Sequence, residues 1–372
     1  MIARSIQNGI PIPMDPLTKL PTIHQKRASA ANATLSLKFE SRIPITKASR
    51  NEVPISAIQE KLLVYQLCSG LGEECDFGLG SIILNLLLIA MYYNKTQGHK
   101  LVVDQSALET YRLNVNHGLF TGYFDTTFAA LDSDKERKRR LGKISEKKKK
   151  EVEIITLGED SFLNAREEAS DHFDTESSEF FRHMSSVVCD SIKINNPTQK
   201  RIRTLLRRSS IPDFFHSDGS KSVSFHIRRG DKVTSGESRA FEANEYAEKL
   251  LKVHRNVTEV TQCFLATDDY TVVSELETAL RKRSVGCNKL HTLASGKYTS
   301  KRDGYHTVLF LAELTMLVDA TYFIGTVNSN VGSLTSFNQG CREDRRDGES
   351  ETNRYNHYYG SHFVDEEEWY LQ

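Results

Sequence analysis

A strand, a glycine-rich loop, an apolar helix and a second strand follow one another where regular patterning begins in this 372-residue chain. Residues 61–70 (KLLVYQLCSG) have the pattern of a buried strand closed by a Ser-Gly turn. A loop with glycines at positions 72, 78 and 80 leads into the apolar run SIILNLLLIAMYY at residues 81–93, and residues 98–104 (GHKLVVD) form a second short strand. This order is a βαβ unit, which indicates a parallel sheet covered by helices.

The second half of the chain repeats the same rhythm. Each of its predicted strands is followed by polar or small residues. Because the carboxyl ends of parallel strands line one crevice, where such folds bind ligands, these residues are expected to lie together. The predicted strands are residues 222–228, 263–269 and 320–326, and the predicted helices are residues 242–253, 270–282 and 305–318.

The length exceeds that of one typical domain, so we expect two domains of the α/β class. Residues 1–58 contain scattered Pro, Ser, Thr and Lys without periodicity, and we interpret them as a flexible arm or stalk. The expected boundaries are residues 59–205 for an N-terminal α/β domain, residues 206–340 for a C-terminal Rossmann-like domain and residues 341–372 for a charged tail. The N-terminal domain would include a charged insertion near residues 132–160 and two linking helices at residues 177–194 and 199–210.

The composition by itself excludes few classes of function. The 49 basic residues balance 49 acidic ones, which gives no global argument for nucleic-acid or membrane binding. Residues 135–150 hold ten basic and two acidic residues, and we interpret them as a solvated insertion, with nucleic-acid binding as the alternative. The longest apolar run is shorter than the roughly 20 residues of a membrane helix, and no signal peptide is visible.

The cysteines do not have the spacing of a structural zinc site, so no metal is expected. Cys68 and Cys75 are equally compatible with a bridged short loop and with isolated buried thiols. Three N-x-S/T sequons, at Asn32, Asn94 and Asn256, permit a location in the secretory pathway. The six cysteines are Cys68, Cys75, Cys189, Cys263, Cys287 and Cys341.

Charged residues gather at three predicted strand ends. A guanidinium matches phosphate oxygens bidentately, and two adjacent arginines, Arg228 and Arg229, cannot both point into a core. We therefore expect one arginine to face the crevice and the other to be held by a carboxylate, most simply Asp231. The small residues of the turn SNVGS offer free backbone N–H groups where a helix begins, so a diphosphate fits between an arginine and that turn. The alternative is an ion-pair network that stabilises loops. The charged or polar residues at the three ends are Arg228, Arg229, Asp231 and Lys232, then Asp268 and Asp269, then Asn328, Ser329 and Asn330.

Competing nucleotide and hydrolase signatures are absent from the sequence. There is no GxxxxGK[ST], no GxGxxG directly after the first strand and no GxSxG.

Residues 226–233 (HIRRGDKV) resemble the HxRRxDKV motif of the α1,6-fucosyltransferase family. The similarity continues in FEANEY (residues 241–246), LATDD (residues 265–269) and the stretch at residues 309–331, and GYFDTTF at residues 122–128 is similar to a GGWETVF-like stretch. The resemblance covers roughly residues 61–340. Related arginine motifs occur in α1,2- and protein O-fucosyltransferases, whereas the DKV extension, TDD and the T-x-x-S turn favour the α1,6-like assignment.

The resemblance implies a GT-B-like fold with two α/β (Rossmann-like) domains facing a cleft. It implies a fucosyltransferase that moves L-fucose from GDP-fucose to a glycan hydroxyl, α1,6 to GlcNAc, with inversion and without a metal or cofactor. The implied partners are GDP-fucose and a glycan or glycoprotein acceptor, and the implied location is the Golgi or secretory-pathway lumen. The membrane anchor, coiled-coil stalk and SH3 domain of the best-known animal members are not visible, and residues 341–372 are too short and too charged for an SH3 domain.

The resemblance also implies roles for single residues. Arg228 would hold the β-phosphate, and Arg229 and Asp231 would shape the loop. Lys232 and Glu237 would take part in the chemistry with Arg228, Glu237 as the base. The donor-binding set also includes His226 and Glu313 for guanine, Ser329 and Asn330 on the phosphate side, and Tyr246, Asp268 and Asp269. Alternatives from the residues themselves are that Tyr246 packs in an interface and that the aspartate pair caps a helix.

Two readings without catalysis remain. An inactive homologue would bind GDP-sugar or glycan without turnover. Arg229-Gly230-Asp231 also spells RGD, an adhesion tripeptide with a high chance frequency.

Overall fold

The structure is a computed structural model, and the arm predicted at residues 1–58 and most of the predicted insertion lie outside the residues it describes. The chain divides into two compact units, Met1–Ser56 and Ala57–Gln372, and all elements below belong to the second. The described residues are 60–66, 78–97, 100–105, 108, 113, 117–132, 139, 152–157, 178–211, 221–230, 233, 239–254, 256–287, 289–293, 303–326, 329–339, 341 and 361–363.

The first sheet contains the predicted βαβ unit. Its four parallel strands have the order β4-β2-β1-β5. Helix α1 (Leu79–Gln97) connects β1 to β2, and residues 82–89 of this helix are all buried. A helix that is apolar on every side belongs in a core, which explains the long apolar run. The strands are β1 (Glu60–Gln66), β2 (Lys100–Asp104), β4 (Ala129–Leu131) and β5 (Val152–Leu157).

The segment predicted as one helix at residues 177–194 is a helix followed by a strand. Helix α5 (Ser178–Ser191) ends, and β6 (Ile192–Ile194) pairs antiparallel with β3 (Phe124–Thr126), which follows the short helix α2 (Leu119–Tyr123). The β-branched Ile192 and Ile194 suit a strand, so a pairing with distant residues overrides the helical pattern.

Helix α6 (Asn196–Arg208) follows β6 after a single residue, Asn195, which forms a well-formed cap. The side chain of Asn195 accepts a hydrogen bond from the Thr198 backbone N–H at 3.0 Å, and Pro197 lies in the first turn. The predicted domain boundary between residues 205 and 206 falls inside this helix.

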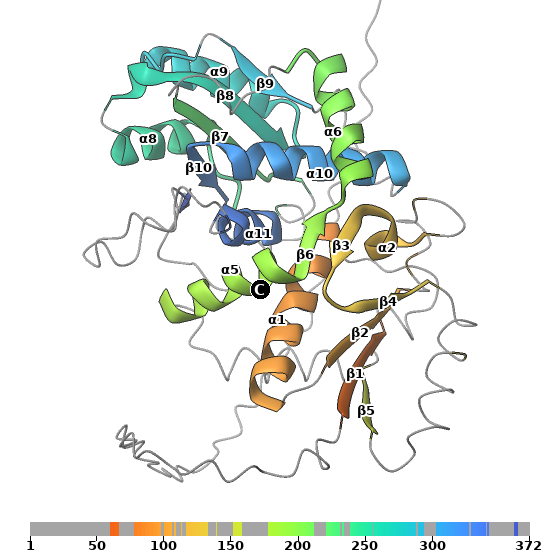
Figure 1. Cartoon of the computed structure of the whole chain (residues 1–372). Helices are drawn as coiled ribbons and strands as arrows, with labels where there is room; N and C mark the ends of the chain where they lie inside the picture. Colours follow the sequence, from red (N-terminus) through yellow and green to blue (C-terminus); the bar gives the residue numbers. More distant parts are fainter. Residues whose placement is uncertain are drawn as a thin grey trace, which may run out of the picture. The chain divides into compact units, whose positions relative to one another are not determined.

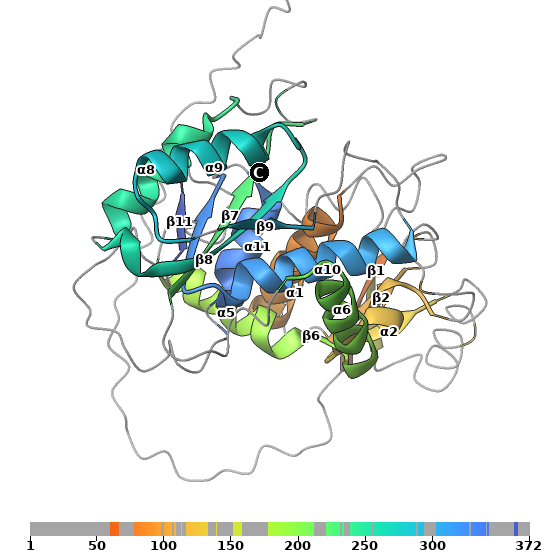
Figure 2. The same cartoon turned by 90° about the horizontal axis from the view of Figure 1, so that it is seen from above.

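The second sheet has five parallel strands in the order β11-β10-β7-β8-β9. Figures 1 and 2 show α8 and α9 on one side of it and α10 on the other. Both sheets are parallel and covered by helices, so the α/β fold class is confirmed, with the two sheets that a GT-B-like fold requires. The strands are β7 (Lys221–Ile227), β8 (Val260–Thr267), β9 (Leu290–Thr292), β10 (Tyr322–Gly325) and β11 (Ser361–Phe363). The helices are α8 (Ala243–Val253), the 3₁₀ helix η3 (Val257–Glu259), α9 (Val272–Lys282), α10 (Gly304–Asp319) and α11 (Asn330–Gln339).

Alternate residues of β7 face the two helical layers. Val223, Phe225 and Ile227 pack in the apolar cluster that contains residues of α8 and α9. Ser224 faces the opposite layer, where its hydroxyl donates to the Leu317 carbonyl of α10 at 3.0 Å. Burial on both faces explains why the strand is almost entirely buried.

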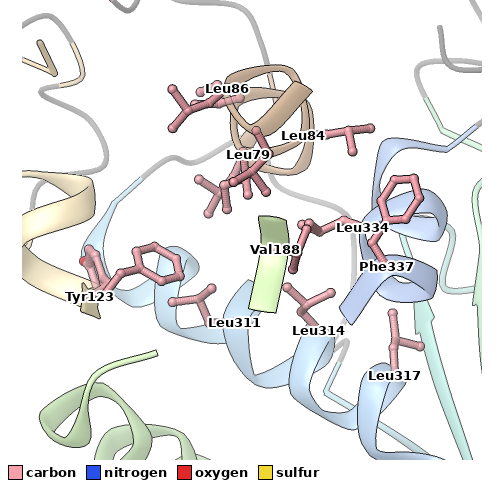
Figure 3. Packing of buried hydrophobic residues seen from close by; sticks show 14 of the residues in the cluster. Leu79, Leu84, Leu86, Tyr123, Val188, Leu311, Leu314, Leu317, Leu334 and Phe337 are labelled. Carbon is pink, nitrogen blue, oxygen red and sulfur yellow. The ribbon is translucent and has the colours of Figure 1, made fainter. Parts of the chain in front are cut away.

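A second apolar cluster joins α1, α5, α10 and α11. Figure 3 shows Leu84 of α1 and Leu334 and Phe337 of α11 among its side chains. Gly80 allows a close approach here, because a Cβ at this position would lie 3.2 Å from Cγ2 of Val331. Among the described residues, no helix combines the length and apolar character needed to cross a membrane.

Two disulfides join separate elements. Cys189 of α5 is bonded to Cys341, just after α11, and Cys263 of β8 is bonded to Cys287, before β9; the Cα atoms lie 5.3 Å and 5.8 Å apart. Cys68 and Cys75 lie outside the described residues.

Candidate functional site

The end of β7 is fixed by the ends of its two neighbours. The Arg228 backbone N–H donates to the Thr326 hydroxyl after β10 at 3.2 Å. On the other side, the Arg229 and Gly230 backbone N–H groups donate to the two carboxylate oxygens of Asp268, after β8, at 2.8 Å and 3.0 Å. Asp268 therefore accepts backbone hydrogen bonds where the strand ladder stops.

Asp268 also sets the surroundings of Arg228. Its Oδ2 lies 3.8 Å from Nε of Arg228, which is an ion-pair distance and longer than a good hydrogen bond. Burial raises the pKa of Asp268, and its hydrogen bonds from the Arg229 backbone and the charge of Arg228 oppose that rise. The Arg228 side chain is 24% exposed, so it is accessible at this edge of the sheet.

Arg229 is held within the protein. Its Nε donates to the Phe241 carbonyl at 2.9 Å and its Nη1 to Glu275 at 2.8 Å, with Asp269 at 4.0 Å. The side chain is only 12% exposed. One arginine is thus accessible and the other anchored, as the sequence suggested, but Glu275 supplies the carboxylate. These contacts do not suit an RGD ligand, whose arginine must reach a partner.

Gly230 is required by close packing at the same point. A Cβ there would lie 2.6 Å from Oδ2 of Asp268, the oxygen that accepts the Gly230 N–H. A side chain at Gly230 would therefore displace the carboxylate that organises the strand end.

Thr326 is the residue that sequence reasoning missed. Its buried hydroxyl donates to the His226 carbonyl at 3.1 Å, accepts from the Arg228 backbone and lies 2.7 Å from the Tyr246 hydroxyl. Its one proton goes to His226, so Tyr246 donates to it. The T-x-x-S signal contained this position, but it gave no indication of three partners.

Tyr246 lies beneath the site. It is fully buried, burial raises the pKa of its hydroxyl, and its ring meets Phe241 edge-on with the centroids 6.4 Å apart. Tyr246 thus packs in the apolar cluster beside the second sheet, where it supports Thr326 from below.

His226 and Glu313 are two poorly hydrated titratable groups on this half of the protein. His226 is 7% exposed, and its Nδ1 has no hydrogen-bond partner among the described residues. Burial lowers its pKa to about 3, so the imidazole is neutral. Glu313 on α10 is only partly buried as a residue, yet desolvation of its carboxyl raises its pKa to about 8.

Ser329 immediately precedes α11, whose first residue is Asn330. Its side chain is 2% exposed, and its hydroxyl has no hydrogen-bond partner among the described residues. The first N–H groups of a helix lack intrahelical partners and carry partial positive charge, so an unpaired buried hydroxyl here favours an anion.

Asp269 has a local structural role. Its carboxylate accepts from the Thr271 backbone at 3.0 Å and from the Thr271 hydroxyl at 2.7 Å, just before α9. These bonds agree with the helix-capping alternative for this residue, whereas Asp268 serves the end of β7.

Four residues that the sequence analysis singled out, Asp231, Lys232, Glu237 and Asn328, lie outside the described residues. Within the described part of the chain, no group of three or more His, Cys, Asp or Glu residues is arranged to hold a metal ion.

No protein-family model matches the chain, and no curated protein matches it. Its fold is similar to that of solved fucosyltransferases. Fucosyltransferase NodZ from Bradyrhizobium is 15% identical, with 75% of this chain and 93% of that chain covered and a TM-score of 0.42. POFUT1 in complex with GDP-fucose is 10% identical, with 86% of this chain and 99% of that chain covered and a TM-score of 0.45. A mutant of Arabidopsis thaliana FUT1 in complex with GDP is 11% identical, with 75% of this chain and 68% of that chain covered and a TM-score of 0.41. Similarity at this distance does not assign an activity, so function rests on this chain's own residues.

Proposed function

We propose that this chain is a glycosyltransferase that moves L-fucose from GDP-fucose to a glycan hydroxyl, with α1,6 linkage to GlcNAc as the specific reaction. Support comes from the HIRRGDKV resemblance together with the geometry at the end of β7. The observation that carries the proposal is that an accessible arginine, Arg228, follows β7, while Ser329, whose buried hydroxyl has no partner among the described residues, follows the neighbouring strand β10.

These groups suit a diphosphate. Leaving a buried hydroxyl unpaired costs about 1–3 kcal/mol, which a phosphate oxygen accepting its proton would recover. Arg228 and the start of α11 add positive charge where the leaving group becomes more negative, so charge stabilisation needs no obligatory metal. Arg229, which is already engaged by Glu275, would keep the loop in place.

His226 and Glu313 suit the guanine. A neutral imidazole can accept a hydrogen bond from a base N–H, and a carboxylate can accept from the N1 and N2 donors of guanine. Glu313 would have to ionise to do so fully, because its raised pKa keeps it largely protonated at neutral pH. GDP binding is therefore expected to release a proton.

The transfer step is an inverting displacement. The acceptor oxygen would form a bond to C1 of fucose while the bond from C1 to the β-phosphate oxygen breaks, and GDP would leave with that electron pair. The acceptor proton would pass to the carboxylate of Glu237, with Lys232 and Asp231 beside it. These three roles rest on the family resemblance, as does the contribution of Asn330.

Two other outcomes use the same site. The chain would be an α1,2- or protein O-fucosyltransferase if another hydroxyl is the acceptor. It would be an inactive GDP-sugar- or glycan-binding homologue if the base is not functional.

We propose the lumen of the secretory pathway, including the Golgi, as the location. Two disulfides are typical of an oxidising compartment, and the sequon residue Asn256 is exposed. Mass spectrometry of the protein from its source cells should find both cysteine pairs and a glycan on Asn256. Reduced cysteines and an unmodified Asn256 would rule this location out.

The activity is tested by incubating the protein with GDP-fucose and a panel of N-glycan, oligosaccharide and protein acceptors. Turnover by the wild type, with loss of about 100-fold or more in Arg228→Ala and Glu237→Gln, supports an enzyme, and product linkage analysis identifies the acceptor hydroxyl. Arg281→Ala, on the exposed side of α9, is the matched control. GDP binding without turnover on any acceptor would leave the inactive homologue.

A further inference from the structure

A cavity of about 580 Å³ lies between α6 and the start of α10, outside the proposed donor site. Its lining includes cationic residues of α6, an aromatic residue of α10 and three aliphatic side chains. The lining residues are Leu113, Lys200, Arg201, Thr204, Leu205, Arg208, Gly304, Tyr305 and Val308.

Three cations line this cavity from one face of α6. All three are exposed: Lys200 and Arg201 lie near the start of the helix, and Arg208 lies about two turns further along the same surface. None of them forms an ion pair with another described residue. Burial raises the pKa of nearby Tyr123, and the positive charge of Arg201 partly opposes that rise.

The other wall is aromatic and apolar. Tyr305 is 61% exposed, the largest exposed fraction among the large hydrophobic residues described. Beside it, Leu113, Leu205 and Val308 give the cavity an apolar floor. An exposed ring suits the flat face of a sugar, whereas arginines suit carboxylate or sulfate oxygens.

The walls are held by hydrogen bonds between elements. The Asn195 amide donates to the Gly122 carbonyl at 3.1 Å, and the Tyr123 hydroxyl donates to the Gly304 carbonyl at 3.5 Å. Gly122 also packs directly on Leu113, because a Cβ there would lie 2.8 Å from Cβ of Leu113. Two lining residues, Gly304 and Leu113, are thus held by contacts with the segment that contains α2.

Asp303, the acidic residue that precedes the lining residue Gly304 in the described part of the chain, is already engaged. The carboxylate of Asp303 accepts from the His306 backbone N–H at 2.9 Å and lies 2.8 Å from Nδ1 of the same residue, as the cap of α10. These hydrogen bonds lower the pKa of Asp303. Its carboxylate is engaged by His306, so the three cations of α6, which form no ion pair with another described residue, outweigh it.

The cavity and the proposed guanine contact use different sides of α10. Val308 and Glu313 are five residues apart, which places them about 140° from each other around a helix axis. The start of α10 nevertheless lies at the same edge of the sheet as the carboxyl ends of the strands, because a crossover helix runs opposite to its strands. A chain of sugars can therefore occupy this cavity while GDP occupies the strand ends.

We propose that this cavity binds a sugar carrying a carboxylate or sulfate group, as part of the acceptor glycan. The acceptor role rests on the proposed fucosyltransferase function, whereas the binding itself does not.

Binding is tested by calorimetry with a heparin-derived hexasaccharide as the anionic probe and maltohexaose as the neutral one. Arg201→Ala/Arg208→Ala should raise the Kd for the anionic probe at least about tenfold, since two charge-assisted contacts are lost. The matched control is Arg203→Ala/Arg207→Ala, which removes two exposed arginines of the same helix that do not line the cavity. This control should change the Kd less than about twofold.

Several outcomes would overturn the cavity assignment: no binding of the anionic probe to the wild type, equal weakening in both double variants, or loss of binding in Arg228→Ala instead.

The acceptor role is tested by transfer to matched acidic and neutral acceptors. The cavity variant should raise KM for the acidic acceptor alone, and unchanged KM values for both would contradict that role. If no acceptor is fucosylated, the proposed function fails while the binding comparison still decides the cavity.

Discussion

At the scale of single residues, Thr326 connects the elements of the site. Thr326→Val keeps the shape but removes the hydroxyl that pairs with the Arg228 N–H and the Tyr246 hydroxyl, whereas the His226 carbonyl keeps the backbone N–H of residue 326 as its donor. Unpaired buried groups cost about 1–3 kcal/mol each, so we expect a loss of about 2–4 kcal/mol in the free energy of unfolding, measured by urea denaturation. Thr315→Val, which removes one hydrogen bond within α10, is the control and should cost less than about 1.5 kcal/mol. Equal losses would refute the connecting role of Thr326.

Gly230 gives a second test at this scale. In Gly230→Ala, the new methyl would push Asp268 away from two backbone N–H groups, which should lower both the melting temperature and the affinity for GDP. Gly78→Ala is the comparison, because a Cβ at Gly78 meets nothing within 4 Å. Thermal unfolding should distinguish the two, and an unchanged melting temperature in Gly230→Ala would argue against the tight strand end.

Glu313 predicts a pH dependence. Its folded pKa of about 8 exceeds its ordinary value of 4.5, so the folded state binds the proton more tightly than the unfolded state. The contribution of the protonated carboxyl to the free energy of unfolding is therefore fully present below about pH 4.5 and is lost as the pH rises through about 8. Urea denaturation at pH values from 5 to 8 should show that the free energy of unfolding falls less with pH in Glu313→Gln than in the wild type. Parallel pH profiles would mean that the carboxyl is not desolvated.

The partner of Arg229 shows what sequence can and cannot specify. Two adjacent arginines at a strand end predict that one is held by a carboxylate, because both cannot enter a core. The sequence named Asp231 as the simplest carboxylate, and Asp231 lies outside the described residues. The contact of Arg229 with Glu275 on α9 was not foreseen, because it forms only after folding. The role of Thr326 was not predicted for the same reason, because its three partners come from distant segments.

At the scale of elements, long segments with strong patterns were predictable and short ones were not. Helix α1 and strand β7 follow from burial on all sides. Strand β11 was not foreseen, because three residues within a charged C-terminal segment carry no pattern and acquire strand geometry only by pairing with β10. Strand β6 was read as helix for the corresponding reason.

The disulfides test how elements are joined. The Cys189–Cys341 bond spans 152 residues and the Cys263–Cys287 bond spans 24. Loop-closure entropy predicts that Cys189→Ala/Cys341→Ala costs about 1.6 kcal/mol more than Cys263→Ala/Cys287→Ala. Denaturation of both variants under non-reducing conditions measures the difference. A larger loss from the shorter loop would show that core packing around Cys263, not chain entropy, dominates.

At the scale of the whole molecule, the second parallel sheet brings a cation, a helix start and a neutral histidine to the carboxyl ends of its strands. Calorimetric titration with GDP tests whether this edge binds a nucleoside diphosphate. We predict that the wild type binds GDP, that Arg228→Ala weakens binding about tenfold or more, and that Arg281→Ala leaves it unchanged. Failure of the wild type to bind GDP at millimolar concentration, or equal affinities in wild type and Arg228→Ala, would show that this edge is not a diphosphate site.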